Sequence, residues 1–464
     1  MGTHIAMRLK LTVIPKVVSL PKRTSKMLPD KLKILSKDLS SLINEDEITA
    51  LAIETGYEVR ESPLRGINFF LIHLLATIDK GMSSSLTELC NQGLVLGVEV
   101  AKESLNDRYT AKASLFMKRV CQLLMSKRLG SEVDFEVLQK FNGIFVSDST
   151  SVEIPRHLCE ALGAQVKGKS TSLLKLDCTF DLQSDWSRLW VRYGSSSDQT
   201  QIMGPPKNSL WIRDLGYYRT QDFSGIDYQG GKFISRARMD IPLYTARSGK
   251  QRVDLEQLID RLSEDEFFEA DVKLGYKRRF PARLVVQRVP DAIAEQKRKE
   301  LIAQKRFKSR KLSDRRIKLC ALNVFITNLE AKEWPASQIQ QLYKIRWQIE
   351  LIFKIWKSHL SLEKVPKMNK YRFECSLYAM LIYISLNHRM IQGLKNYYWN
   401  DLGIQLSEIK TAKMINVHIQ KLIASLLGIP HAAEKFVQTL FGALMRYGKK
   451  EVRYVNKNPL FNTC

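Results

Sequence analysis

The sequence predicts an α/β fold in which a strand-rich middle section is flanked by helical sections. Before residue 141 and after residue 335, apolar residues recur with helical spacing. Between these limits, short runs alternate apolar and polar residues as strands do. The chain has 464 residues, of which 44% are hydrophobic, so at about 100–200 residues per domain it can fill the cores of two to four domains.

Residues 1–140 are predicted to form a helical region. Helical spacing marks three segments in it, namely Leu32–Leu42, Gly66–Ile78 and the long Val100–Arg128. The glycines Gly93 and Gly97 precede the long helix, so the stretch from Ser83 onward fits two structures equally well. One is a helix-turn-helix that reads DNA, and the other is an ordinary helical bundle.

Strands are expected from residue 141 to residue 330. The expected strands are 141–147, 171–182, 187–194, 209–214, 232–238, 268–275, 282–289 and 321–329. We expect 141–240 and 331–400 to form two parts of one α/β core, with 241–330 inserted between them as a β-rich, basic section. Residues 401–464 are expected to be helical, and Ile419–Leu427 and Phe436–Met445 have apolar faces suited to dimerisation.

The charge balance narrows the class of partner. The chain carries 73 Lys and Arg against 48 Asp and Glu, a formal charge of +25, which favours a polyanion such as nucleic acid or a membrane surface. No apolar stretch approaches the roughly 20 residues of a membrane-spanning helix. Seven scattered cysteines without a C-x-x-C pair indicate reduced thiols rather than a disulfide framework or a zinc site. We therefore expect a cytoplasmic protein that binds DNA or RNA and does not enter a membrane.

One motif suggests a nucleotide site. Gly163–Ser170 matches the P-loop pattern G-x-x-x-x-G-K-[ST], which works when a strand precedes the loop and a helix follows it. Here the preceding residues have helical spacing and the following residues, 171–182, alternate as a strand. Because this order is inverted, a turn between two elements is favoured, and a P-loop NTPase is kept as a less favoured alternative.

Two aspartates stand where expected strands end. Asp148 follows the apolar run 144–147, and Asp214 follows 210–213 and precedes a Gly-containing turn. Strand ends at the edge of an α/β sheet are where such folds place ligand-binding groups, although a turn-forming aspartate is the simpler explanation for each. Asp177 and Asp181, in or just beyond another strand, compete with them.

A helix from 343 to 357 would present a third carboxylate. At about 100° per residue, one face of this helix collects Tyr343, Arg346, Glu350 and Lys357, with Trp347 and Lys354 beside them. Apolar residues on the opposite face would anchor the helix to a core. The alternative is a solvated face held by ion pairs of Glu350 with Arg346 and Lys354.

The spacing Tyr343-x2-Arg346-x3-Glu350-x6-Lys357 resembles the Y-R-E-K signature of DDE transposases in the insertion-sequence-four family. Asp148 in VSDST and Asp214 in IRDLGY resemble the first and second catalytic aspartates of that family. The resemblance covers about residues 141–400. It implies a ribonuclease H-like, retroviral-integrase-like core with a β-rich insertion between the second aspartate and the glutamate.

The resemblance also implies an activity. Asp148, Asp214 and Glu350 would be catalytic and would hold two Mg²⁺ ions, for which Mn²⁺ can substitute. The protein would bind terminal inverted repeats, cleave the element ends and join the 3′-hydroxyl ends to target DNA, in a cut-and-paste pathway with or without a hairpin intermediate. A catalytically inactive, transposase-derived DNA-binding protein is the alternative.

The implied partner is double-stranded DNA, bound by a homodimer in a synaptic complex at the bacterial nucleoid. The implied DNA-binding residues are Tyr343, Arg346 and Lys357, with Lys354 and Trp347 as neighbours. Residues 1–140 would bind the element ends. The segment Lys297–Lys318 carries eleven Lys and Arg against Glu300 and Asp314, and fits phosphate contacts better than it fits a solvated helix or loop.

Overall fold

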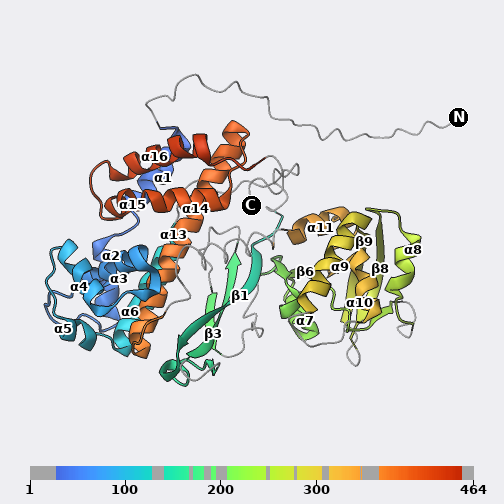
Figure 1. Cartoon of the computed structure of the whole chain (residues 1–464), viewed down its shortest axis with the longest axis horizontal. Helices are drawn as coiled ribbons and strands as arrows, with labels where there is room; N and C mark the ends of the chain where they lie inside the picture. The colour runs from blue at the N-terminus through green and yellow to red at the C-terminus, as the bar shows by residue number, and fades with distance from the viewer. Residues whose placement is uncertain are drawn as a thin grey trace.

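The computed structural model describes ten parts of the chain: 28–127, 140–166, 171–181, 190–194, 206–246, 251–275, 280–305, 313–344, residue 346 and 365–451. Some residues in the strands, including Asp148, are described by their backbone alone. Figure 1 shows the N-terminal helices on one side of strands β1 and β3, and a second group of helices and strands on the other side.

The N-terminal part is helical. Its elements are α1 (Asp30–Ser40), α2 (Glu45–Glu54), α3 (Gly66–Lys80), η1 (Gly81–Ser83), α4 (Leu86–Val95), α5 (Lys102–Asp107) and α6 (Ala111–Ser126). The single long helix expected from residue 100 to 128 is wrong. The chain breaks between α5 and α6, where the Thr110 side chain caps α6 by accepting a hydrogen bond from the Ala113 amide at 3.3 Å. The long second helix of the helix-turn-helix interpretation is therefore two helices.

The middle of the chain contains all ten described strands, which form one mixed sheet. The strands are β1 (Ile144–Pro155), β2 (Gln165–Val166), β3 (Thr171–Asp181), β4 (Trp190–Gly194), β5 (Leu210–Arg213), β6 (Lys232–Arg236), β7 (Leu243–Thr245), β8 (Phe267–Leu274), β9 (Phe280–Arg288) and β10 (Leu322–Thr327). Their order is β2-β3-β1-β5-β6-β10-β9-β8-β7, and β4 also pairs with β3. Among these described strands, only the pairs β1–β5 and β5–β6 are parallel.

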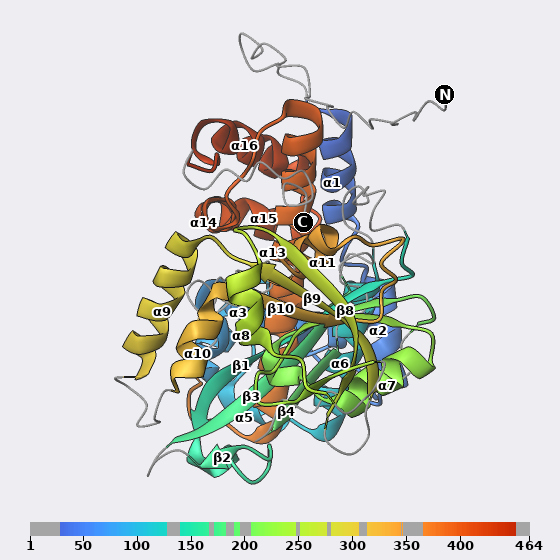
Figure 2. The same cartoon turned by 90° about the vertical axis from the view of Figure 1, so that its right-hand side faces the viewer.

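The strands of 241–330 continue the sheet rather than forming a separate one. β10 lies between β6 and β9, so the section expected as an insertion shares hydrogen bonds with the expected core. The shorter elements between the strands are η2 (Arg156–Leu158), η3 (Leu215–Tyr217), α7 (Thr220–Tyr228), α8 (Leu255–Arg261), α9 (Asp291–Lys305), α10 (Asp314–Lys318), η4 (Leu319–Ala321) and α11 (Ala336–Lys344). Figure 2 shows α9 and α10 at one margin of the face that carries β8 and β9.

The two faces of the sheet belong to different apolar clusters. Ile144 and Leu210 belong to a large cluster shared with the N-terminal and C-terminal helices. Phe145 and Trp211, one position along each strand, stack at 4.6 Å within the second cluster. This alternation is the period-two pattern of a sheet buried on both sides. The even-numbered residues of β1 and β5 therefore face the first, large cluster. Ile339 and Tyr343 of α11 belong to the same cluster, so α11 covers this face.

The C-terminal part is helical and consists of α13 (Lys370–Leu402), α14 (Glu408–Val417), α15 (Ile419–Leu426) and α16 (Ala432–Tyr447). The long helix α13 packs against α3 and α6, and α1 packs against α15 and α16 (Figure 1). Within the described residues, no helix combines the length and apolarity that crossing a membrane requires.

Candidate active site

The parallel register of β1, β5 and β6 places three chain-distant residues in a row. Each residue of β5 that pairs with β1 is 66 positions later in the chain, which is also the separation of Asp148 and Asp214. Each residue of β6 that pairs with β5 is 22 positions later, which is the separation of Asp214 and Arg236. The described pairs end at Val146–Ile212 and Arg213–Ser235, and continuing their offsets makes positions 148, 214 and 236 correspond. Because in-register neighbours of a parallel sheet share a face, these positions belong to the face that α11 covers.

Asp148 does not end its strand as expected. β1 continues to Pro155 because β3 pairs with it along its whole length, with Asp148 opposite Cys178. Its described pairing with β5, however, stops at Val146. Asp148 therefore lies two residues past the last residue of β1 that pairs with β5, at the level where β5 itself ends.

Asp214 directly follows β5, as the sequence predicts, and two side chains reach its carboxylate. The Tyr343 hydroxyl donates to its Oδ1 at 3.4 Å, and the Arg346 Nε lies 3.7 Å from the same atom. The Asp214 side chain keeps 36% of its exposure, so solvent still reaches the carboxylate. The arrangement is a partly exposed carboxylate oriented by a hydroxyl and a guanidinium.

Tyr343 is held in place by its neighbours. Its ring lies 5.1 Å from the ring of Phe325 in β10, and the Arg346 guanidinium lies 5.7 Å from its centroid. Burial raises the pKa of Tyr343, so the hydroxyl is neutral at physiological pH and can donate to Asp214. The helical spacing expected from 343 to 357 predicted that Tyr343 and Arg346 share a face, and both do reach Asp214.

The remaining expected residues of this helix, Trp347, Glu350, Lys354 and Lys357, lie outside the described residues. Among the described residues, no three His, Cys, Asp or Glu side chains gather as a metal-binding group, and this search covers neither Glu350 nor the Asp148 side chain. What is described fits a hard cation, because Asp214 offers accessible carboxylate oxygen at the edge where Asp148 is level with it.

Asp181, which competes with Asp148 and Asp214 as a candidate, has a structural role. It is 1% exposed, and its Oδ1 accepts a hydrogen bond from the Ile144 amide at 3.1 Å, at the start of β1. This contact holds the first residue of β1 rather than facing an open site. Asp177 pairs with Ser149 in the β1–β3 ladder, away from β5.

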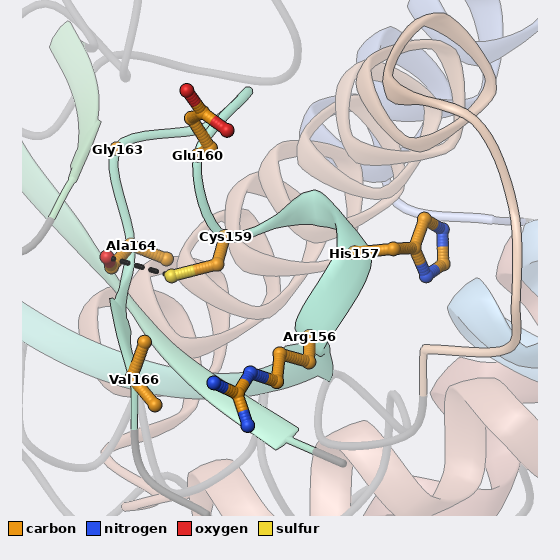
Figure 3. A pocket seen from close by; sticks show the side chains of 7 residues that line it. All are labelled: Arg156, His157, Cys159, Glu160, Gly163, Ala164 and Val166. Atoms are coloured by element: carbon orange, nitrogen blue, oxygen red, sulfur yellow. Dashed lines mark hydrogen bonds between the residues drawn. The ribbon is translucent and has the colours of Figure 1, made fainter. Parts of the chain in front are cut away.

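The P-loop motif has the wrong surroundings. Residues 171–181, directly after the motif, form β3, so the helix whose N-terminus would meet phosphate is a strand instead. A cavity of about 680 Å³ lies beside the first half of the motif, lined by residues 156–166. Figure 3 shows Cys159 directed at Ala164, whose carbonyl accepts its hydrogen bond, while His157 points away and bonds the Met368 carbonyl. The described part of this region, which contains η2 and β2, connects β1 to β3.

Local sequence patterns do not single out Arg236. Its level position beside Asp214 depends on pairing between strands that are not adjacent in the chain, which no local pattern encodes. The one signal was its place near the end of the strand-like run 232–238, a position similar to the one that selected Asp214.

Comparison with known proteins identifies the class. A family model described as the transposase DDE domain matches residues 139–386, which is more than half of the chain and contains β1, β5, α11 and the row of level residues. The chain therefore belongs to the transposase DDE domain family. This confirms the prediction of a DDE transposase, which was made from the spacing of residues 343–357 together with Asp148 and Asp214, whereas the Y-R-E-K signature itself stays a prediction.

Individual relatives cover nearly the whole chain. It is 26% identical over 455 residues to the transposase for insertion sequence element IS231B from Bacillus thuringiensis subsp. berliner, covering 93% of this chain and 95% of that protein. It is 22% identical over 450 residues to the transposase for insertion sequence element IS1151 from Clostridium perfringens, covering 92% and 95%. A shorter match, 34% over 95 residues, joins 20% of the chain to 26% of the putative transposase InsL for IS186A from Escherichia coli (strain K12).

Proposed function

We propose that the protein is a cut-and-paste DNA transposase. It binds the terminal inverted repeats of its element, cleaves the element ends and joins the 3′-hydroxyl ends to target DNA, as a homodimer in a synaptic complex. The observation that carries this proposal is the β1–β5 register, whose continuation makes Asp148 correspond to Asp214, the carboxylate that Tyr343 and Arg346 approach. Membership of the transposase DDE domain family supports it.

The strand order supports a ribonuclease H-like core, similar to that of retroviral integrases. β4, β3 and β1 are antiparallel neighbours, and β5 and β6 follow β1 in parallel, which is the arrangement of such a core. In this proposal 141–240 and 331–400 supply the core and 241–330 supplies the insertion, whose strands extend the core sheet. Residues 1–140 would bind element ends, and 401–464 would contribute to dimerisation.

Three carboxylates would hold the metal ions. Asp148, Asp214 and Glu350 supply hard oxygen ligands suited to two Mg²⁺ ions, with Mn²⁺ able to substitute. Bound ions would offset phosphate charge and supply an activated water or 3′-hydroxyl for in-line displacement. The chain's own part is to fix the carboxylates, and the Tyr343 hydroxyl and Arg346 guanidinium orient Asp214.

The DNA end would be held by cations and aromatic residues of the segment 343–357, which begins at the end of α11. Arg346 is suited to a bidentate phosphate contact and Lys357 to a point-charge contact, with Tyr343, Trp347 and Lys354 beside them. The basic segment Lys297–Lys318, part of which forms α9 and α10, would add contacts that depend on salt and not on base sequence.

The direct test is Mg²⁺-dependent cleavage of duplex DNA that carries the element's own inverted repeats. Glu350→Gln keeps the size of the side chain but removes the carboxylate, so we expect DNA binding to persist while cleavage and strand transfer are lost. Glu333→Gln, at an exposed position before α11, is the matched control and should cleave as the wild type does. Normal cleavage by Glu350→Gln would show that the proposed active site is wrong.

The same assay separates the alternatives. A wild-type protein that binds the repeats but neither cuts nor joins them under any divalent metal would be a DNA-binding derivative of a transposase. A requirement for ATP that Lys169→Ala abolishes would restore the P-loop interpretation, against which the strand β3 stands.

A further inference from the structure

A basic cavity opens next to the candidate active site. Its volume is about 870 Å³, and its lining begins at Leu215, the residue that follows Asp214. Four cations line it, namely Arg236, Arg238, Lys297 and Arg316, against the two acids Asp240 and Glu300. The cavity therefore joins the end of β5 to the basic segment that begins in α9.

One of these cations is already neutralised. Arg238 makes two hydrogen bonds to the Asp240 carboxylate, from Nε at 3.0 Å and from Nη2 at 2.5 Å. For Arg236 and Lys297, no carboxylate among the described residues forms an ion pair with either side chain. Two partly buried cations in one cavity repel each other, and an anion between them would relieve that repulsion.

Both cations are held by the fold. Arg236 ends β6, where it pairs with Phe325 of β10 and is level with Asp214. The Lys297 ammonium donates to the Asn323 side chain at 2.8 Å, and Asn323 in turn donates to Gln287 at 2.9 Å. Gln340 of α11 donates to the same Gln287 oxygen at 2.5 Å. This polar chain ties the position of Lys297 to the helix that carries Tyr343.

The electrostatic coupling of these groups reaches the active site. Burial, followed by the charge of Arg236, lowers the pKa of Lys297 to about 8, while Cys320 and Glu300 oppose the shift. The charge of Arg236 also acts on Tyr343, whose hydroxyl bonds Asp214. Arg236 is thus close enough to influence Lys297 on one side and Tyr343 on the other.

From this arrangement we propose that Arg236 and Lys297 form a phosphate-binding site for the DNA backbone, adjoining the Asp214 carboxylate on the side away from β1. The site holds a phosphate next to the one that is cleaved, and so positions the DNA strand over the carboxylates. Arg236 and Lys297 are positioning residues, since the reacting atoms lie at Asp148, Asp214 and Glu350. This inference rests on the proposed transposase function.

The first test measures binding to duplex DNA carrying the element's inverted repeat. Arg236→Gln and Lys297→Gln should each weaken binding roughly tenfold, the size expected when a charged hydrogen bond is lost. Each should also reduce the slope of log affinity against log salt by about 0.9, the value for one phosphate contact. Lys332→Gln is the charge-matched control, because Lys332 is exposed and lies outside both the cavity and the basic segment Lys297–Lys318. It should change neither the affinity nor the salt slope by as much.

A second measurement distinguishes contact from misfolding. Single backbone phosphates near the cleavage position are replaced in turn by neutral methylphosphonates. We expect one position that weakens binding by the wild type but does not further weaken binding by Arg236→Gln or Lys297→Gln. If every replacement weakens the variants as much as the wild type, the two side chains contact no phosphate and the inference is overturned.

The pH dependence gives a third readout. The charged form of Lys297 binds phosphate, so affinity should be full below about pH 8 and decline as pH rises toward 9.5. Lys297→Arg, which stays charged, should remove that decline, and Arg236→Gln should move it to higher pH by removing the neighbouring positive charge. A decline that Lys297→Arg leaves unchanged would contradict the proposal.

The outcomes also separate this inference from the proposed function. If the wild type cleaves the repeats, Glu350→Gln does not, and the Arg236 and Lys297 variants bind and cleave as the wild type does, only the phosphate site is wrong. If the wild type does not cleave repeat DNA at all, the proposed function fails. Acylation of Lys297 can be measured in the presence of inorganic phosphate or of DNA. If phosphate protects Lys297 and DNA does not, the cavity is a free-anion site and the DNA assignment is overturned.

Discussion

Tyr343 shows how much one side chain can contribute at this site. Its hydroxyl reaches Asp214 while its ring packs against Phe325, so one residue both orients a carboxylate and joins α11 to β10. These two parts can be separated by substitution, because phenylalanine keeps the ring and removes only the hydroxyl.

We expect Tyr343→Phe to lower the single-turnover cleavage rate about tenfold, since a hydrogen bond to a charged group contributes roughly 1.5 kcal/mol. Its thermal unfolding midpoint should stay close to that of the wild type. Tyr343→Ala should lower both, because it also removes a buried ring at a cost of about 3–5 kcal/mol. Cleavage by Tyr343→Phe at the wild-type rate would show that the hydroxyl does not orient Asp214 during the reaction.

Gly143 precedes β1 and sets where that strand begins. Its φ is +146°, and a Cβ on it would lie 2.8 Å from the Phe145 ring. We expect Gly143→Ala to destabilise the protein by about 1–3 kcal/mol through strain and overpacking, measured by urea unfolding. The control is Gly393→Ala in α13, where the added Cβ meets nothing within 4 Å apart from the backbone of its own helix. Helix propensity should there raise the stability by about 0.5–1 kcal/mol. If Gly143→Ala and Gly393→Ala changed the stability in the same direction and by the same amount, this account of the start of β1 would be wrong.

At the scale of elements, α13 depends on buried polar contacts with its neighbours. Glu374 accepts a hydrogen bond from Ser114 of α6 at 2.6 Å, and Arg372 donates to the Ser84 carbonyl at 2.7 Å. Lys395, 2% exposed, pairs with Glu408 of α14 at 2.6 Å, and Lys450 approaches the same carboxylate at 3.7 Å. These contacts fix the orientation of a helix that apolar packing alone would allow to rotate.

We expect Glu408→Ala to destabilise the protein by about 3–5 kcal/mol, because it leaves the Lys395 ammonium buried without its partner. Urea unfolding monitored by circular dichroism would measure the loss. Glu295→Gln, which breaks an exposed ion pair with Arg298 on α9, should have little effect. A small loss in Glu408→Ala would mean that the C-terminal helices dock without this pair.

The same pair predicts a pH dependence. Burial alone would raise the pKa of Glu408, but the charges of Lys395 and Lys450 outweigh it and hold the pKa below its usual value. A carboxylate with a lowered folded-state pKa stabilises the protein above its unfolded-state pKa, and this stabilisation is lost as pH falls through the folded value. Between about pH 5 and pH 3, the wild type should therefore lose more stability than Glu408→Gln does. Parallel losses would show that Glu408 is not the group responsible.

At the scale of the whole molecule, one sheet supports both the candidate active site and the basic cavity. β1, β5 and β6 bring positions 148, 214 and 236 level, and β10 and β9 carry the polar chain that leads to Lys297. Apolar clusters on both faces hold this sheet in place. Neither cluster includes one of the proposed metal ligands.

We accordingly expect removal of divalent cations to separate activity from folding. Excess EDTA should abolish cleavage of repeat DNA, while the circular dichroism spectrum and the unfolding midpoint of the DNA-free protein change little. Restoring Mg²⁺ or Mn²⁺ should restore cleavage. Cleavage that persists after chelation and dialysis would contradict the two-ion proposal, and unfolding on chelation would show a structural metal instead.

The sequence by itself determined the order of helical and strand-rich sections, the position of Asp214 at a strand end and the family-level resemblance. Each of these depends on residues close together in the chain or on motif spacing, which hydrophobic periodicity and side-chain chemistry encode directly. The break at Thr110 was also local, but the helical spacing on both sides of it concealed the capping residue.

Only the tertiary structure decided the level positions of Asp148, Asp214 and Arg236, the continuation of β1 past Asp148, and the meeting of Arg236 with Lys297 in one cavity. Strand register is fixed by pairing partners and by which residues the sheet buries on each face, and these belong to segments far apart in the chain. A charge of +25 indicated a polyanionic partner. Which Lys and Arg side chains lie near the Asp214 carboxylate, however, depends on packing between segments that are far apart in the chain.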